Sequence, residues 1–111
     1  MKRDVHFRVT GRVQGVMFRQ TLIRAAQTRR IQGGASNLPD GSVACFLSGA
    51  SERIDEILEG LRSGKEINSW GARVEALSLL EASNGIAFDR HQVTTGNVDT
   101  FRWSGGVDMF L

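Results

Sequence analysis

The stretch that decides the fold is VHFRVTGRVQGVMFRQTLIRAAQ, residues 5–27. In residues 5–10 apolar and polar side chains alternate, which is the period-two pattern of a half-buried strand. A loop bracketed by glycines runs from Gly11 to Gly15. Apolar residues then recur at helical spacing, which predicts a helix from Phe18 to about Arg30. The chain therefore opens with a strand, a tight loop and a helix.

The remaining elements continue outward from this unit in the order β-α-β-β-α-β. A hairpin is expected around the turn Leu38-Pro39-Asp40-Gly41, since proline fits the second turn position and glycine tolerates a positive φ. The later elements are a helix capped by Ser51 and stopped near Gly64, a strand at 73–80, and a short last strand at 100–103. This order predicts a ferredoxin-like α+β fold, an antiparallel sheet with two helices on one face.

Length and composition fit one domain spanning 1–111. The chain has 111 residues and a formal net charge of +2, a mild excess that favours an anionic partner but not nucleic acid over a small phosphate. Its one cysteine, Cys45, permits no intramolecular disulfide, which favours the cytoplasm. No signal-peptide pattern and no apolar run of about 20 residues is present, so we expect no membrane association.

The glycine-bracketed loop gives the strongest local signal for chemistry. Where a strand enters a helix, several backbone N–H groups can converge on one point, and the helix N-terminus adds positive potential. Arg19 follows in the first helical turn, and its guanidinium can bind two phosphate oxygens at once. The loop is neither a Walker A motif nor a Gly-x-Gly-x-x-Gly motif. From the residues alone, an anion site and a tight connection with a surface arginine are equally consistent with this pattern.

Two motifs in the chain resemble one known family. The segment Gly11–Arg19 resembles the first acylphosphatase signature, and Asn37–Val43 resembles the second. On its own, an asparagine before a turn most often hydrogen-bonds its own backbone. Residues 71–75 also resemble the family, so the likeness covers about 5–80 and resumes at 101–103. Because both signatures occur together at fixed spacing, the chain is identified as a member of the acylphosphatase family.

The resemblance implies an activity and a role for each matching residue. The activity is hydrolysis of small acyl phosphates to carboxylate and inorganic phosphate, without cofactor or metal ion. Arg19 would bind the phosphate, and Asn37 would orient the attacking water. The phosphate-binding loop would consist of Gln14, Gly15, Val16, Met17 and Phe18, which would offer backbone N–H groups. Inorganic phosphate or sulfate would compete for this site, and we expect a monomer.

The sequence departs from the family pattern at three places. Gly34 stands where the family usually has an aromatic residue, which predicts looser packing beneath the asparagine strand. Met17 occupies a position that is often glycine. The loop 81–99 is longer than usual, and residues 104–111 extend past the usual end.

Other functions have less support in the sequence. His6 and His91 have no Cys or carboxylate at ligand spacing, so no metal site is expected. Cys45 lies on an apolar strand face and is expected in the core. An RNA-binding sheet would need aromatic residues on its central strands, and residues 42–48 offer only Phe46. A phosphate-binding module that keeps the fold without turnover stays open, because of Gly34.

Overall fold

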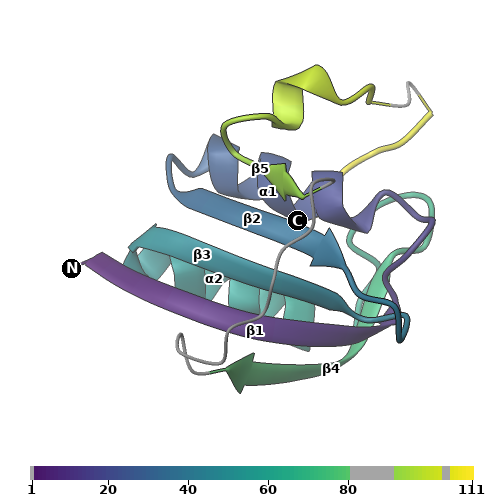
Figure 1. The fold of residues 1–111 in the computed structure, drawn as a ribbon, viewed down its shortest axis with the longest axis horizontal. Coiled ribbons are helices and arrows are strands. Elements are labelled where there is room, and N and C mark those ends of the chain that lie inside the picture. Colours follow the sequence, from purple (N-terminus) through teal and green to yellow (C-terminus); the bar gives the residue numbers. More distant parts are fainter. Residues whose placement is uncertain (1, 81–91, 104–105) are drawn as a thin grey trace.

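The computed structural model describes residues 2–80, 92–103 and 106–111 (Figure 1). The segment 81–91, which includes His91, and residues 104–105 lie outside the described residues. The described elements, in chain order, are β1 (Lys2–Arg12), α1 (Phe18–Thr28), β2 (Gln32–Asn37), β3 (Val43–Ala50), α2 (Ser51–Arg62), β4 (Arg73–Leu80), β5 (Val93–Thr94) and a short 3-10 helix (Val98–Thr100).

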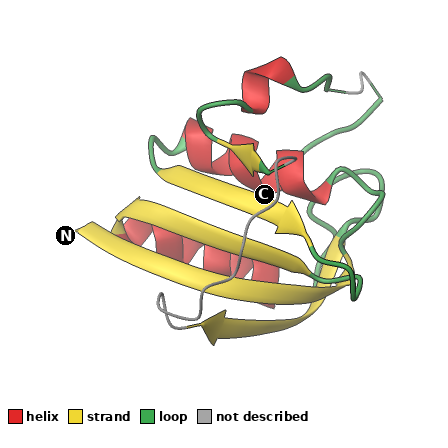
Figure 2. Cartoon of the chain, in the orientation of Figure 1, coloured by secondary structure: helices red, strands yellow, loops and turns green. Residues whose placement is uncertain are grey.

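The strands form one antiparallel sheet in the order β4-β1-β3-β2-β5, and α1 and α2 cover the same face of it (Figure 2). The predicted ferredoxin-like α+β fold is confirmed. The apolar side chains between sheet and helices form the core. Its largest fully buried members include Phe7, Phe18, Leu22, Leu47 and Ile57. Cys45 lies in this core as expected, and burial raises the pKa of its thiol.

The predicted strand at 100–103 is wrong. Thr100 ends the 3-10 helix, and the fifth strand is Val93–Thr94, which pairs with Gly34 and Ala35 of β2. The alternation of large and polar residues at 100–103 does not reflect sheet pairing, because the backbone there is bound to α1. The Arg24 guanidinium donates to the carbonyls of Val98 and Phe101, at 3.3 Å each.

The predicted helix ends differ from the structure in small ways. Helix α1 ends at Thr28, two residues before the expected Arg30. Ser51 is the first residue of α2 rather than its cap, since Ala50 holds the cap position without a side-chain hydrogen bond. Gly64 follows the end of α2 with a φ of 73°, the left-handed conformation that ends helices at glycine.

The packing lost at Gly34 is replaced by neighbouring side chains. Gly34 pairs with Phe46 across β2 and β3. A Cβ added at Gly34 would lie 2.4 Å from Cε1 of Phe46 and 2.8 Å from Nε2 of Gln92. The phenyl ring and the amide therefore fill the space above the glycine, an arrangement in which a cross-strand aromatic residue covers a glycine. The expected looser packing at Gly34 is not found.

The turn between β2 and β3 is held by Asp40. The Asp40 carboxylate accepts hydrogen bonds from the backbone N–H and the hydroxyl of Ser42, and Arg8 pairs with it at 3.2 Å. The Leu38 N–H donates to the Ser42 carbonyl at 2.8 Å, and Gly41 has a φ of 93°. The hydrogen bonds from Ser42, with a smaller contribution from Arg8, lower the pKa of Asp40. This turn directly follows Asn37.

Asp40 should stabilise the fold in a pH-dependent way. Its pKa is lowered on folding, so its stabilisation is complete above the unfolded value of 3.8 and is lost as the pH falls through the folded value. We expect Asp40→Ala to unfold at lower urea concentration than wild type at neutral pH. The difference should shrink as the pH falls below 3.8.

Ser42→Ala serves as the control, because it removes the hydroxyl donor that contributes most to the lowered pKa of Asp40. The difference in urea midpoint between Ser42→Ala and Asp40→Ala should therefore vary less with pH than the difference between wild type and Asp40→Ala. A gap between wild type and Asp40→Ala that stays constant across the acid range would contradict the role of Asp40.

Candidate active site

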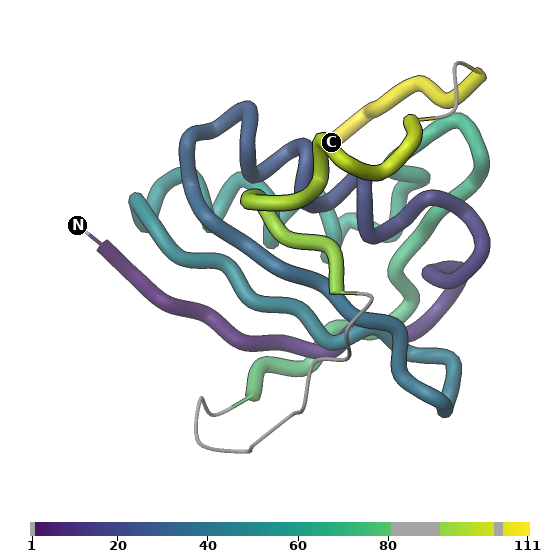
Figure 3. Tube along the Cα trace, turned by 45° about the horizontal axis from the view of Figure 1, so that its top comes forward, coloured from purple at the N-terminus to yellow at the C-terminus, as the bar shows by residue number. Residues whose placement is uncertain are grey.

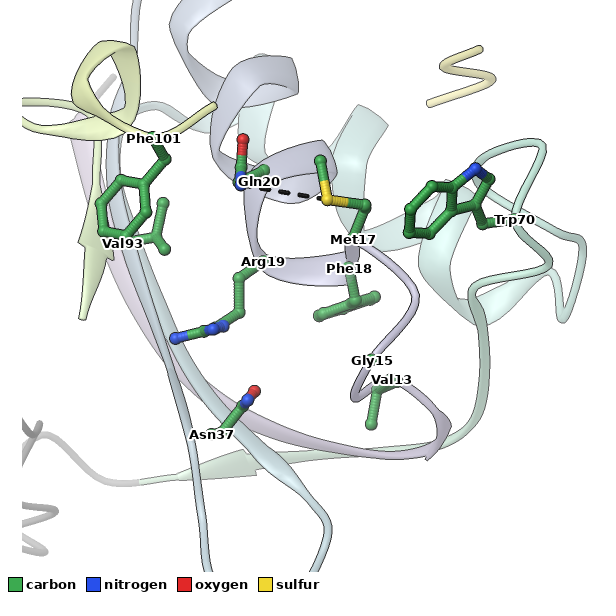
Figure 4. Close-up of a pocket in the computed structure, with 10 residues that line it drawn as sticks. All are labelled: Val13, Gly15, Met17, Phe18, Arg19, Gln20, Asn37, Trp70, Val93 and Phe101. Carbon is green, nitrogen blue, oxygen red and sulfur yellow. Dashed lines mark hydrogen bonds between the residues drawn. The ribbon is translucent and has the colours of Figure 1, made fainter. Parts of the chain in front are cut away.

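A cavity of about 230 Å³ opens where the start of α1 meets the end of β2 (Figure 4). Its walls come from four regions of the chain: residues 13–20, which run from the loop after β1 into α1, the end of β2, the segment around residue 70, and the segment 93–101. The lining residues are Val13, Gly15, Met17, Phe18, Arg19, Gln20, Asn37, Trp70, Val93 and Phe101.

Arg19 and Asn37 meet in this cavity as the sequence motifs imply. Figure 4 shows the guanidinium and the amide both directed into it, from the first turn of α1 and the last residue of β2. Asn37 pairs with the fully buried Val43, which places its side chain on the helix-covered face of the sheet. Its Oδ1 is buried and has no hydrogen-bond partner among the described residues. Asp40, rather than this oxygen of Asn37, caps the following turn.

Gln14 connects the loop to the strand that carries Asn37. Its side-chain amide donates to the carbonyls of Leu38 and Ser42, at 3.0 and 2.9 Å. The side chain of Gln14 is therefore occupied with the β2–β3 turn. Of the five residues expected in the phosphate-binding loop, Gly15, Met17 and Phe18 line the cavity, whereas Gln14 and Val16 do not. The backbone N–H contributions of all five stay predictions.

Met17 makes the transition from loop to helix in an unusual conformation. It occupies the cap position of α1 with φ 59° and ψ 25°, the left-handed region that costs a residue other than glycine roughly 1–2 kcal/mol. Within the described chain, α1 has no side-chain cap hydrogen bond and no acidic residue in its first turn. The cap residue Met17 thus offers no side-chain acceptor to the first turn of α1, and a bound anion would supply one.

Several residues of the cavity wall could not be predicted from the sequence. The sequence predicts a loop at Val93 and a strand at Phe101. It does not show their contacts with β2 and α1, which lie far away in the chain. Trp70 belongs to neither signature motif, and it lies at the cavity edge with 42% of its surface exposed. Gln20 follows Arg19 directly, and its neighbourhood in the chain was the one signal that could have identified it.

The described residues contain neither a cluster of metal ligands nor a membrane-spanning helix. Within 2–80, 92–103 and 106–111, no three His, Cys, Asp or Glu side chains converge as metal ligands would. None of the helices described is both long enough and apolar enough to cross a membrane.

Comparison with known proteins identifies the family. The acylphosphatase family model matches residues 5–93, a range that ends at the first residue of β5, and residues 94–111 lie beyond the match. An acylphosphatase of Paraburkholderia xenovorans is 38% identical over 87 residues, covering 78% of this chain and 86% of the relative. An acylphosphatase of Chlorobaculum tepidum is 41% identical over 68 residues, covering 61% of this chain and 74% of the relative.

Solved structures agree with the sequence relatives. The crystal structure of an acylphosphatase from Bacillus subtilis superposes with a TM-score of 0.61 at 26% identity, covering 79% of this chain and 92% of that one. An acylphosphatase from Coxiella burnetii gives a TM-score of 0.61 at 27% identity, with coverages of 79% and 84%. With the two signatures, the shared fold and the matched range together, this chain belongs to the acylphosphatase family.

Proposed function

We propose that this protein is an acylphosphatase, which hydrolyses the carboxyl–phosphate bond of small acyl phosphates without a metal ion. The observation that carries the proposal is the convergence of Arg19 and Asn37 in one cavity at the uncapped N-terminus of α1. Family membership adds support, since relatives that align over most of their length carry this name. We further propose that the protein is monomeric and cytoplasmic. The cytoplasmic location fits the single cysteine, which is buried.

The phosphate group would be held at the positive end of α1. Guanidinium groups bind phosphate oxygens in pairs, and Arg19 projects from the first turn where the helix dipole adds positive potential. The backbone amides between Gly15 and Phe18 would donate to the same oxygens. Both contributions act on charge that spreads over the phosphoryl oxygens in the transition state.

Asn37 would place the attacking water. Its buried Oδ1 faces the cavity and has no partner among the described residues, so it can accept a hydrogen bond from a water molecule. The water oxygen forms a new bond to phosphorus while the bond from phosphorus to the carboxyl oxygen breaks. A neutral amide does not take up a proton near pH 7. The proton of the water therefore passes to a phosphate oxygen of the substrate.

The leaving group explains why no acid residue is needed. A carboxylate has a conjugate-acid pKa of about 4, like that of Asp or Glu, and leaves without protonation. The chain would supply positioning and charge stabilisation, the main contributions to phosphoryl transfer. Inorganic phosphate or sulfate would occupy the same position as the substrate phosphate and compete with it.

The roles of Arg19 and Asn37 can be separated kinetically with benzoyl phosphate in buffer containing EDTA. Arg19→Ala should lose about 10²-fold or more in kcat/KM and bind inorganic phosphate more weakly, because Arg19 touches the phosphoryl group in every state. Asn37→Ala should lose about 10²- to 10³-fold in kcat with little change in the inhibition constant for phosphate.

Arg62→Ala is the control, because Arg62 is the last residue of α2, is exposed and does not line the cavity. Its kinetics should match wild type. Wild-type turnover in Asn37→Ala would remove Asn37 from catalysis, and activity that disappears in EDTA and returns with magnesium would exclude the metal-free mechanism.

A further inference from the structure

Asn68 is a fully buried polar residue next to the candidate site that the proposed mechanism does not use. Its amide nitrogen donates to the Val16 carbonyl at 2.8 Å and to Oγ1 of Thr21 at 2.9 Å. Its Oδ1 accepts from the backbone N–H groups of Trp70 and Ala72, at 3.0 and 3.2 Å. Both donors and both acceptor positions of the amide are therefore occupied.

These bonds fix the direction of two peptide groups in the loop. In a planar trans peptide, the C=O and the following N–H point in opposite directions, and the described chain has no cis peptide bond. Asn68 holds the Val16 carbonyl, which turns the Met17 N–H away from Asn68. Thr21, whose Oγ1 accepts from Asn68, donates through the same Oγ1 to the Met17 carbonyl at 2.7 Å. Holding this carbonyl turns the Phe18 N–H away from Thr21, just as the Met17 N–H is turned away from Asn68. Met17 and Phe18 line the cavity.

We propose that Asn68 is a positioning residue, which holds the loop so that the amides of Met17 and Phe18 point at the phosphate. The proposal rests on the proposed function of this cavity. Asn68 touches neither the cavity nor a substrate bound there, and it acts through the two carbonyls. Such orientation matters because amides fixed in advance cost no reorganisation when charge develops on the phosphate.

The segment that carries Asn68 is in turn held by the C-terminal residues. The Ser69 N–H donates to the Asp108 carbonyl at 2.9 Å, the Asp108 N–H donates to Oγ of Ser69 at 2.7 Å, and Asn68 forms a β-bridge with Met109. Figure 3 shows this C-terminal segment running beside the loop between α2 and β4. Residues 106–111 lie beyond the range matched by the family model, so the segment that holds Asn68 in place is not part of the matched domain.

The test is the affinity for inorganic phosphate, measured by calorimetry on folded protein. Asn68→Ala should bind phosphate between roughly 10-fold and 10²-fold more weakly than wild type. Asn68→Asp keeps the acceptor for Trp70 and Ala72 but replaces the amide donor, so it should lose affinity as well. Thr21→Val removes the hydroxyl that donates to Met17 and accepts from Asn68 but leaves the bond from Asn68 to Val16, so it should show a smaller loss.

The control is Ile57→Val, a core substitution in α2, away from the cavity. It should lower the melting temperature and leave phosphate affinity unchanged, which separates orientation from stability. Wild-type affinity in folded Asn68→Ala or Asn68→Asp would overturn the role of Asn68. A wild-type protein that neither binds phosphate nor hydrolyses benzoyl phosphate would instead refute the proposed function.

A second observation concerns the far end of the cavity. Figure 4 shows Val93 and Phe101 on the side of Arg19 away from the Gly15 loop. Arg19 is the only charged residue among the described residues that line the cavity. Phe101 is held there from α1, because Arg24 binds the carbonyls of Val98 and Phe101, and Gln20 donates to the Arg102 carbonyl at 3.4 Å.

We infer that Val93 and Phe101 form an apolar wall for the acyl group, so that substrates with uncharged apolar acyl groups are favoured. This inference also rests on the proposed function. With the phosphate at the loop, Arg19 is occupied, and a charged acyl group would find no described partner in the wall. An apolar group would instead displace water from Val93 and Phe101, which is favourable.

The test compares benzoyl phosphate with acetyl phosphate. Phe101→Ala should lower the ratio of kcat/KM for benzoyl over acetyl phosphate by about 10-fold, and Phe101→Leu should lower it less. Leu79→Ala, an exposed site on β4, should leave the ratio unchanged. An unchanged ratio in Phe101→Ala with both substrates hydrolysed would overturn this wall alone, whereas hydrolysis of neither substrate by wild type would refute the proposed function.

Discussion

The two hydrogen bonds from the Gln14 amide to the carbonyls of Leu38 and Ser42 are the contact on which the candidate site depends. They join the loop after β1 to the turn after β2. Arg19 follows that loop, and Asn37 precedes that turn. The sheet brings β1 and β2 close only through the intervening β3. A direct bond between their ends is therefore what sets Arg19 and Asn37 on opposite sides of one cavity.

The same loop is fixed from its other side by Asn68, so that its backbone has little freedom. Gln14 holds the loop at the strand end, and Asn68 holds Val16 at the helix end. Between these points, Met17 adopts a left-handed conformation that would otherwise be unfavourable. The strain at Met17 and the uncapped helix start fit a site that awaits an anion. In such a site, part of the stability of the fold is given up so that the ligand can complete it.

Much of the fold could be predicted from the sequence, because the deciding signals are local. The alternation before Gly11, the helical spacing after Phe18 and the Pro39–Gly41 turn all predict the elements that are found. The two signatures assign Arg19 and Asn37 to one site, and both residues line the same cavity. Their chemical roles were implied by resemblance and remain proposals.

The rest depends on contacts between residues far apart in the chain. Phe101 shows a strand-like pattern, but Arg24 draws its backbone onto α1. The role of Asn68 has no sequence signal, since its partners Val16 and Thr21 lie about fifty residues earlier, at separations of 52 and 47. The sequence predicts a packing defect at Gly34, because it does not show that the ring of Phe46, which belongs to another strand, covers the glycine.

The most direct test of the central claim is an NMR titration of the wild-type protein with inorganic phosphate, followed through its backbone amides and arginine side chains. The account predicts that the largest shifts occur at the amides from Gly15 to Phe18 and at the Arg19 guanidinium. The arginines at the other end of α1, Arg29 and Arg30, offer an alternative anion site beside Arg53. Shifts concentrated at those arginines, with the Gly15–Arg19 segment unchanged, would contradict the claim that this loop is the phosphate site.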